Sequence, residues 1–411
     1  SKFGANNKWA MFPSVSLAWR ISEEKFMEEQ SVFQDLKLRI GYGQSGNQNI
    51  DPYTSQRLYG PQSSQFMYNG EWINSYGVSQ NPNPDLKWET TAMTNIGLDY
   101  TIWEGRVSGT LDFYNKETKD MLYKYNVPSP PYQYNQLLAN GASMTNRGVE
   151  FMVNVVAVDR PDFSWTTNFN VAYNKNEIGS LDSNVDNLSI SERYEGTMYL
   201  EGWTAQTVSI VKPGLPIGTF YTYKYMGYDA KQQKTLYENA AGEIVTIDKL
   251  KSPDDYQVVG SALPKVTFGW NNTFRYKRWD LNFFLRGVTG NKIFNASRAD
   301  LSRLTQAAIC NISHEAVEDG IMEAPQPSSR WLENGSFLKL DNVTLGYQFD
   351  TEKMPGINNL RVYITGQNLF TITKYTGIDP EVSLSGLAPG IDNRNYYPKT
   401  RSFLLGVNIS F

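Results

Sequence analysis

The C-terminal stretch, residues 399–411, alternates apolar and polar side chains with a period of two, broken only by Leu404. Its apolar positions are Phe403, Leu405, Val407, Ile409 and Phe411. This period predicts a β-strand whose two faces meet different surroundings. In a water-soluble sheet the apolar face packs on a core. In an outer-membrane barrel that face meets lipid and the polar face lines a wet interior, so other segments of the chain must decide between the two.

The same alternation recurs in about thirteen segments, most of them in closely spaced pairs. They are residues 9–20, 36–42, 95–102, 107–113, 148–158, 165–173, 206–212, 220–225, 266–274, 279–285, 343–349, 360–372 and 399–411. Short turns alternate with long polar connections, among them 46–87 and 291–336. Outer-membrane barrels have short periplasmic turns and long extracellular loops. The pattern therefore predicts an all-β, antiparallel transmembrane barrel with both long loops on the same side.

The composition agrees with a barrel and excludes other classes. Aromatic residues make up 14% of the 411 residues, although the mean hydropathy is negative. Half-polar strands with aromatic girdles have such a composition. No apolar run approaches the roughly 18 residues of a transmembrane helix. The net charge of −4 and the lack of a basic patch in the sequence exclude a nucleic-acid partner.

Residues that could carry catalysis or hold a metal are scarce. The chain has one cysteine, Cys310, and one histidine, His314, so we expect no intramolecular disulfide and no zinc site. Asp254 and Asp255 are adjacent carboxylates in a polar segment, where a solvated pair is the expected state. We therefore expect no enzymatic activity, no metal and no cofactor.

Several stretches carry recognisable motifs in a fixed order. They lie at 12–20, 83–90, 146–150, 216–221, 335–347, 362–370, 377–381 and 397–401. Examples are Asn-Pro-Asp-Leu-Lys-Trp-Glu-Thr at 83–90, Gly-Ile-Asp-Pro-Glu at 377–381 and Tyr-Pro-Lys-Thr-Arg at 397–401. Together these motifs resemble the SusC/RagA family of TonB-dependent outer-membrane transporters. Relatives often carry an acidic stretch before the strand at Pro264, but 238–244 is poor in carboxylates, so we expect no calcium site there.

The resemblance implies a fold. Residues 1–411 would be the C-terminal part of one plugged barrel domain of about 22 strands. The N-terminal extension, TonB box, plug and early strands have no counterpart in this sequence. The first and last strands should run in the same direction, so an odd number of further strands, about nine, would complete the barrel. The strand at 399–411 would close the barrel and resembles the signal that the barrel-assembly machinery recognises.

The resemblance also implies a function. It is TonB-dependent import of glycans or other oligosaccharides across the outer membrane, with peptides as a second substrate class. The partners would be outer-membrane lipids, a SusD-like surface lipoprotein that caps the barrel, and the TonB complex, which acts through the N-terminal region. A passive porin or a surface adhesin or receptor is the alternative, and a secreted soluble β-protein is the third hypothesis.

Aromatic residues in the predicted external loops are candidates for substrate contact, because the C–H faces of sugar rings pack on aromatic rings. They are Tyr59, Trp72, Tyr76, Tyr199, Trp203, Trp331, Tyr396 and Tyr397. Packing between loops, or in the outer aromatic girdle, is the alternative role for each of them.

The strand faces lead to two further predictions. Charged residues on the polar faces should pair with one another in a wet lumen. They are Arg39, Arg106, Asp112, Glu150, Arg275 and Arg286. Apolar residues on the opposite faces should meet lipid. They are Phe268, Trp270, Phe283, Leu285, Val343, Leu345 and Val407.

Overall fold

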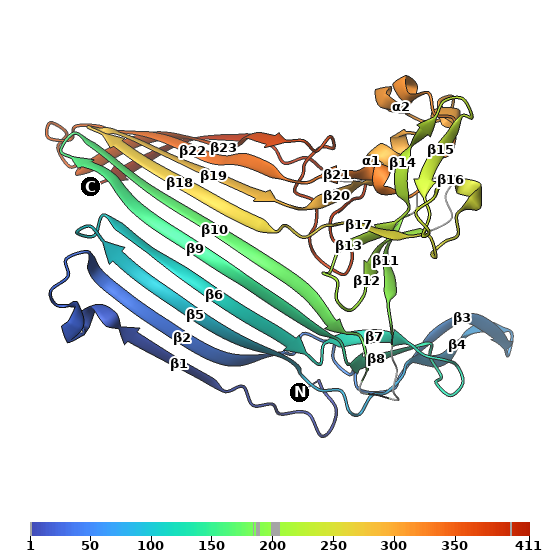
Figure 1. Cartoon of the computed structure of the whole chain (residues 1–411). Helices are drawn as coiled ribbons and strands as arrows, with labels where there is room; N and C mark the ends of the chain where they lie inside the picture. The colour runs from blue at the N-terminus through green and yellow to red at the C-terminus, as the bar shows by residue number, and fades with distance from the viewer. Residues whose placement is uncertain (1, 184, 186–189, 199–205, 395–396) are drawn as a thin grey trace.

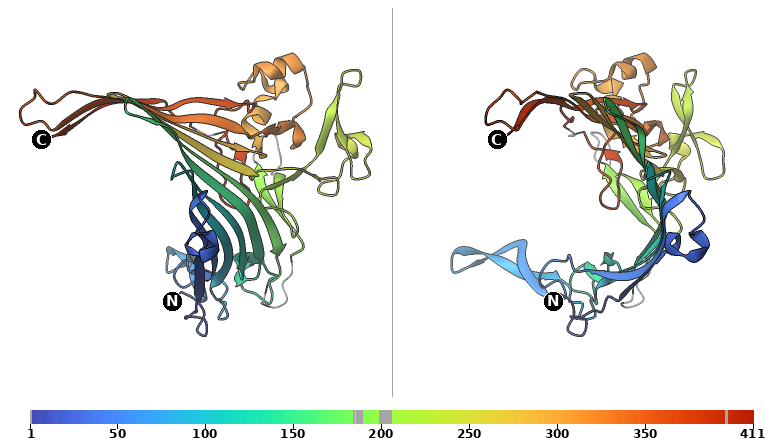
Figure 2. Two further views of the ribbon diagram at one scale, coloured as in Figure 1. Left: turned by 60° about the vertical axis from the view of Figure 1, so that its left-hand side comes forward. Right: turned by 90° about the vertical axis from the view of Figure 1, so that its left-hand side faces the viewer.

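The computed structural model describes the chain except residues 1, 184, 186–189, 199–205 and 395–396. An 11-stranded antiparallel sheet, in the order β1-β2-β5-β6-β9-β10-β18-β19-β22-β23-β25, forms a curved wall (Figures 1 and 2). Its strands are β1 (Ser14–Arg20), β2 (Phe33–Asn47), β5 (Glu89–Ile102), β6 (Val107–Lys119), β9 (Ser143–Arg160), β10 (Phe163–Ser180), β18 (Val266–Tyr276), β19 (Trp279–Thr289), β22 (Phe337–Gln348), β23 (Asn359–Thr373) and β25 (Ser402–Ser410).

Connections of very different length leave the two ends of the wall. At one end three turns are tight, at 103–106, 161–162 and 277–278. Two are longer, at 349–358 and at 21–32, and the latter carries the 3-10 helices η1 (Ile21–Glu23) and η2 (Lys25–Met27). At the other end every connection is long, and all five gather on the same side of the wall (Figure 1). Because successive strands are antiparallel neighbours, alternate connections must fall at the same end. The predicted placement of 46–87 and 291–336 on one side is therefore confirmed.

The long connections form small sheets of their own. Two are two-stranded: β3 (Leu58–Tyr68) with β4 (Glu71–Gln80), and β7 (Leu122–Asn126) with β8 (Gln136–Asn140). One is four-stranded and contains β11 (Arg193–Met198), β12 (Gln206–Val211), β13 (Thr219–Thr222) and β17 (Gln257–Ser261). Two are three-stranded: one contains β14 (Lys224–Asp229), β15 (Lys234–Glu238) and β16 (Ile244–Thr246), and the other contains β20 (Lys292–Asn295), β21 (Leu332–Asn334) and β24 (Ile391–Asp392). Two predicted barrel strands, 206–212 and 220–225, thus lie in loop sheets, because their alternation reflects packing within the loops and not the wall.

Helices are short and confined to the connections. They are α1 (Ala296–Leu301), α2 (His314–Asp319), η3 (Ile247–Lys249), η4 (Leu304–Gln306) and η5 (Ser329–Trp331). Within the described residues, none of the helices has the length and apolar character needed to cross a membrane.

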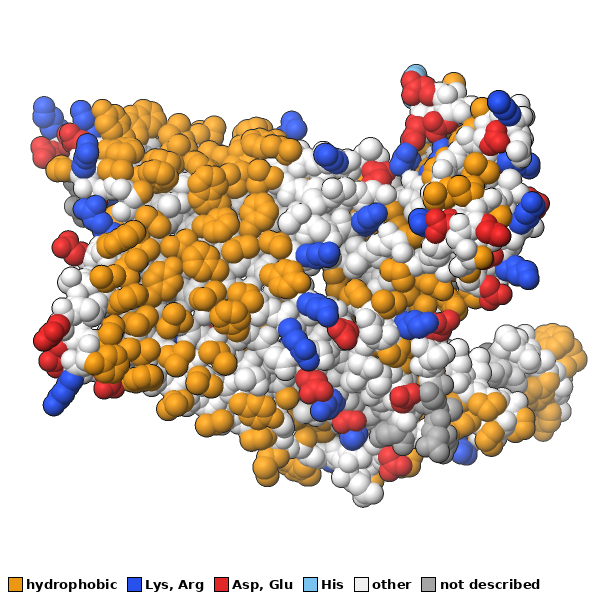
Figure 3. Space-filling view, viewed as in Figure 1, with side chains coloured by type: hydrophobic (Ala, Val, Ile, Leu, Met, Phe, Trp, Pro, Cys, Tyr) orange, Lys and Arg blue, Asp and Glu red, His pale blue; other side chains and the backbone are white. Residues whose placement is uncertain are grey.

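The wall has an apolar convex face. Leu405 lies opposite Ile364, which lies opposite Leu345, and this register continues the apolar row from strand to strand. The registers put all seven residues predicted to meet lipid on this one face. Figure 3 shows an apolar band across the wall, with charged side chains near the turn end and on the loop side. An exposed band of this kind is suited to hydrocarbon and not to water.

The wall has two open edges, β1 and β25, among the described strands. In an antiparallel sheet the first and the eleventh strands run in the same direction, as predicted, so these two cannot pair antiparallel with each other. Closure therefore needs an odd number of further strands. In β25, Phe403, Leu405, Val407 and Ile409 share the convex face, and Phe411 follows the strand. Its role as an insertion signal stays a prediction.

Candidate functional site

The concave face of the wall carries charged bridges. Arg39 on β2 donates from Nη2 to Asp99 Oδ1 on β5 (2.7 Å) and to Asp112 Oδ1 on β6 (3.0 Å). The second contact crosses β5 at Gly97, which lies opposite both Arg39 and Asp112. A Cβ atom at residue 97 would lie 2.4 Å from Asp112 Oδ1 and 2.6 Å from Arg39 Nη2. The missing side chain of Gly97 therefore makes the three-strand bridge possible.

A second bridge of the same design lies near the other edge. Arg361 on β23 donates to Asp280 on β19, with an Nε–Oδ1 distance of 2.8 Å and an Nη2–Oδ2 distance of 2.5 Å. It passes over Gly346 on β22, where a Cβ atom would lie 2.5 Å from both Arg361 Nη2 and Asp280 Oδ1. Glycine in the middle strand lets a long cation reach across two strands at both places.

Glu381 forms the densest charge cluster on this face. It accepts from Arg286 Nη1 (2.5 Å), Lys339 Nζ (2.6 Å) and Lys399 Nζ (2.5 Å). Burial by itself would raise the pKa of Glu381, but the hydrogen bonds from the three cations outweigh it and lower the pKa to about 2. The cluster joins the wall to the connection 374–401. It also brings together the motifs at 377–381 and 397–401, which sequence analysis did not connect.

The predicted pairing of lumen charges is confirmed in part. Arg39, Asp112 and Arg286 form salt bridges. Arg106, Glu150 and Arg275 make no salt bridge with any residue that the structure describes. Glu150 on β9 and Arg275 on β18 therefore leave unpaired charges among the described residues of the concave face, whereas Arg106 lies in the turn before β6 and not on a strand.

The loop end contains a buried core. Phe220, Phe294 and Trp331 pack together, and Trp331 is only 1% exposed. Its Nε1 donates to the Gln326 carbonyl (2.8 Å), and the Arg330 guanidinium lies 4.8 Å from the ring centroid. Trp331, a candidate for substrate contact, thus has the alternative role of packing between loops, because the loop connections fold around it.

Other predicted aromatic residues are exposed. Tyr59, Trp72 and Tyr76 lie on the β3–β4 hairpin, which projects from the loop end (Figures 1 and 2), and Tyr397 precedes β25. Tyr199, Trp203 and Tyr396 fall outside the described residues. The exposed residues do not converge on one cavity. Tyr59, Trp72 and Tyr76 make the hairpin an apolar projection at the mouth of the wall.

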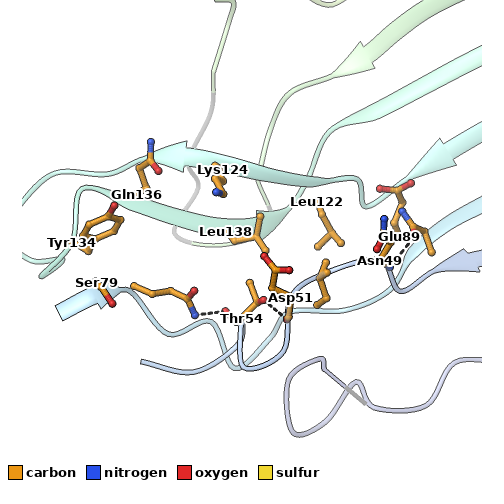
Figure 4. Close-up of a pocket in the computed structure, with 13 residues that line it drawn as sticks. Asn49, Asp51, Thr54, Ser79, Glu89, Leu122, Lys124, Tyr134, Gln136 and Leu138 are labelled. Atoms are coloured by element: carbon orange, nitrogen blue, oxygen red, sulfur yellow. Dashed lines mark hydrogen bonds between the residues drawn. The ribbon is translucent and has the colours of Figure 1, made fainter. Parts of the chain in front are cut away.

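A pocket of about 420 Å³ lies at the base of this hairpin (Figure 4). Five segments line it: the end of β2, the connection after β2, the end of β4, the start of β5 and the β7–β8 hairpin. The lining residues are Asn47, Asn49, Ile50, Asp51, Thr54, Ser79, Gln80, Glu89, Leu122, Lys124, Tyr134, Gln136 and Leu138. Its volume falls in the range of small-molecule sites, roughly 300–1,000 Å³.

Side-chain amides hold the pocket walls in place. Gln80 Nε2 donates to the carbonyls of Thr54 (3.0 Å) and Gln56 (2.8 Å), which fixes the connection after β2. Asn81 Nδ2 donates to the Gln136 carbonyl (2.9 Å), and Asn83 Nδ2 donates to the Leu138 carbonyl (2.9 Å). The motif at 83–90 therefore docks the β7–β8 hairpin against the wall.

The segments predicted as strands do not include the β7–β8 hairpin, so the sequence did not reveal this pocket. The available signal was the alternation within β7, where Tyr123 and Tyr125 turn into a core and Leu122 and Lys124 line the pocket. A five-residue strand is too short for period-two alternation to stand out.

The side chains are not arranged for acid–base catalysis or metal binding among the described residues. Asp255 accepts from the backbone N–H groups of Ala240 (2.9 Å) and Lys251 (2.7 Å), and these bonds lower its pKa. It thus holds a loop turn and is more engaged than the solvated pair that the sequence suggested. No three His, Cys, Asp or Glu side chains of the described residues are grouped to hold a metal ion.

The curved wall, its apolar convex face, its charged concave face and its long loops at one end define one side of an outer-membrane β-barrel. The comparison with known families agrees. The chain belongs to the TonB dependent receptor-like, beta-barrel family, whose model matches residues 1–369. It is a family of transporter barrels, in line with the expectation that the chain is not an enzyme.

Individual relatives support the SusC/RagA resemblance. The chain is 34% identical to the TonB-dependent receptor SusC of Bacteroides thetaiotaomicron, over 100% of this chain and 41% of the relative. It is 31% identical to the TonB-dependent receptor P26 of Formosa agariphila, over 100% and 43%. The solved structure of the RagAB peptide transporter matches with a TM-score of 0.82 and 28% identity, over 100% and 44%. The chain thus spans less than half the length of these relatives.

Proposed function

We propose that the complete protein imports oligosaccharides across the outer membrane with energy supplied through TonB. Membership of the TonB-dependent receptor family supports energy-coupled import. The main observation in favour of a polar, sugar-like cargo is the pocket at the mouth of the wall. Most of its lining residues are polar, and two of them, Asn47 and Glu89, belong to strands of the wall.

We also propose a SusD-like surface lipoprotein as the partner at the loop end. The β3–β4 hairpin supports this idea. A two-stranded hairpin is marginally stable in water by itself. Its exposed Tyr59, Phe66, Tyr68, Trp72 and Tyr76 form an apolar surface of the kind that marks protein contacts.

Peptides remain the second candidate cargo. The observation that favours them is the fold similarity to the RagAB peptide transporter, with a TM-score of 0.82. Aromatic side chains serve both classes, because they pack on sugar faces and on apolar peptide side chains.

Uptake measurements test the proposal. Cells with and without the gene for the complete protein, and cells that lack TonB, are given fluorescent oligosaccharides and fluorescent peptides of similar size. We expect oligosaccharide uptake to be lost in both mutant strains. Uptake that survives the loss of TonB would indicate a porin, surface binding without uptake would indicate an adhesin, and loss of peptide uptake alone would assign the second cargo.

A further inference from the structure

We propose that the pocket at the base of the β3–β4 hairpin binds a neutral sugar unit of the incoming oligosaccharide. This inference rests on the proposed import function and adds a site and a charge preference. Its residues belong to the end of β2 and the connection after it, to β4, to β5 and to the β7–β8 hairpin, and Figure 4 shows them around one space.

The pocket opens on the lumen side of the wall. Asn47 on β2 lies opposite Glu89 on β5. Counting along each strand in steps of two, Asn47 shares its face with Arg39, and Glu89 shares its face with Asp99. Arg39 and Asp99 form the charged bridge on the concave face. A molecule in the pocket would therefore lie where cargo enters the lumen.

Unused polar groups face this space. The side chains of Asn49, Glu89, Lys124 and Gln136 form no hydrogen bond or salt bridge with any other residue in the described part of the chain. The two amides can donate to and accept from hydroxyl groups, the carboxylate can accept from them, and the ammonium group can donate to them. Leu122 and Leu138 supply apolar surface beside them, which suits the C–H face of a sugar ring.

Main-chain groups around the pocket are already occupied, and this favours sugar over peptide. The carbonyls of Gln136 and Leu138 accept from Asn81 and Asn83, and the Ile50 carbonyl accepts from Lys2 Nζ (2.6 Å). An extended peptide usually binds by adding a strand to free main-chain groups at a sheet edge. With these acceptors engaged, side chains must provide recognition, as hydroxyl-rich ligands require.

The charges of the pocket favour a neutral ligand over an anionic one. Asp51 and Glu89 bring two carboxylates, and Lys124 brings one ammonium group. A carboxylated sugar would add a further negative charge next to this excess, and like charges that meet without partners weaken binding. We therefore expect discrimination against uronic-acid oligomers.

Binding to the complete protein in lipid nanodiscs, together with its lipoprotein partner, tests the site. The probes are malto-, cello- and xylo-oligosaccharides, an oligogalacturonate and a peptide of similar length. We expect a neutral oligosaccharide to bind, and Gln136→Ala and Glu89→Gln each to weaken its binding about ten-fold, as loss of hydrogen bonds in a ligand site does. Glu89→Gln should also improve binding of the oligogalacturonate.

Two matched variants control for general damage. Gln133→Ala changes the same residue type on the β7–β8 connection, and Glu29→Gln changes an exposed carboxylate in the connection between β1 and β2, away from the hairpin. Neither residue lines the pocket, so both should bind like the unchanged protein. Surface abundance and capture of the lipoprotein partner report on folding of all four variants.

The outcomes separate this inference from the proposed function. If no oligosaccharide binds the unchanged protein, both fail. If a neutral oligosaccharide binds and is imported, but Gln136→Ala and Glu89→Gln bind it as the controls do, the pocket assignment alone is overturned. Weakened peptide binding in the same two variants, without oligosaccharide binding, would overturn the sugar assignment in favour of a peptide subsite.

Discussion

Leu405 in the wall is 77% exposed, whereas Trp331 in the loops is 1% exposed. The wall turns its apolar side chains outward and its ion pairs inward, as in the bridge from Arg39 to Asp112. The loops do the reverse, since Phe220 and Phe294 are buried and most charges face water. One chain thus follows two rules for burial, and the change occurs where the strands leave the apolar band. The difference teaches that the surroundings, lipid or water, decide which face of an alternating segment is buried.

The largest expected effect is the loss of stability when a large apolar side chain is removed, which should differ between the loops and the wall. Trp331→Ala should destabilise the loop end by about 3–5 kcal/mol, because it empties a packed core. Leu405→Ala should cost far less, since lipid chains fill the vacated space. Hydrogen exchange of the loop amides in the complete protein measures the first effect, and refolding into lipid vesicles measures the second. Equal costs would contradict the idea that only the loops have a packed interior.

The wall could be predicted from sequence and the loops could not, for a physical reason. Each wall strand has one face toward lipid and one toward the lumen, and most of these strands have nine or more residues. The alternation of apolar and polar residues therefore indicates both faces from the sequence alone. The loop strands are short, and their burial depends on partners far away in sequence, such as Phe220 on β13 with Phe294 on β20. For the same reason, the sequence shows Glu381 as part of a motif but does not show that Arg286, Lys339 and Lys399 pair with it.

The next effect tests the two faces of the wall itself. Leu345→Lys should cost about 2–4 kcal/mol, as a cation does at a lipid-facing site in the middle of the membrane. Thr344→Lys, one residue away on the opposite face, should be tolerated far better because its ammonium group can meet water. The free energy of folding into lipid vesicles gives both numbers. Similar costs for the two variants would refute the assignment of the faces.

A smaller effect concerns the glycine under the charged bridge. Gly97→Ala places a Cβ atom within 2.4 Å of Asp112 Oδ1, so either the strands or the bridge must move. We expect a loss of about 1–3 kcal/mol, typical of overpacking. Gly41→Ala on β2 is the matched control, because nothing lies within 4 Å of a Cβ atom there. If both variants unfold alike in lipid vesicles, the glycine has no special role in the bridge.

The smallest effect is confined to the connection that Glu381 ties to the wall. Its pKa is lowered from an ordinary value of 4.5 to about 2, so its ion pairs contribute fully above pH 4.5. That contribution is lost as the pH falls from 4.5 towards 2, because protonation removes the charge that Arg286, Lys339 and Lys399 share. The hydrogen-exchange protection of the amides in 374–392, measured relative to the intrinsic exchange rate at each pH, should fall over this range, while amides in β22 and β23 stay protected by their ladders.

Glu381→Gln provides the control for other carboxylates that titrate over the same range. The glutamine cannot gain a proton, so exchange in 374–392 should already be fast at neutral pH and should respond much less to acid. A variant that keeps the full acid response would show that another group holds the connection. The expected result would show that ion pairs hold this loop segment to the barrel, whereas backbone hydrogen bonds hold the strands beneath it.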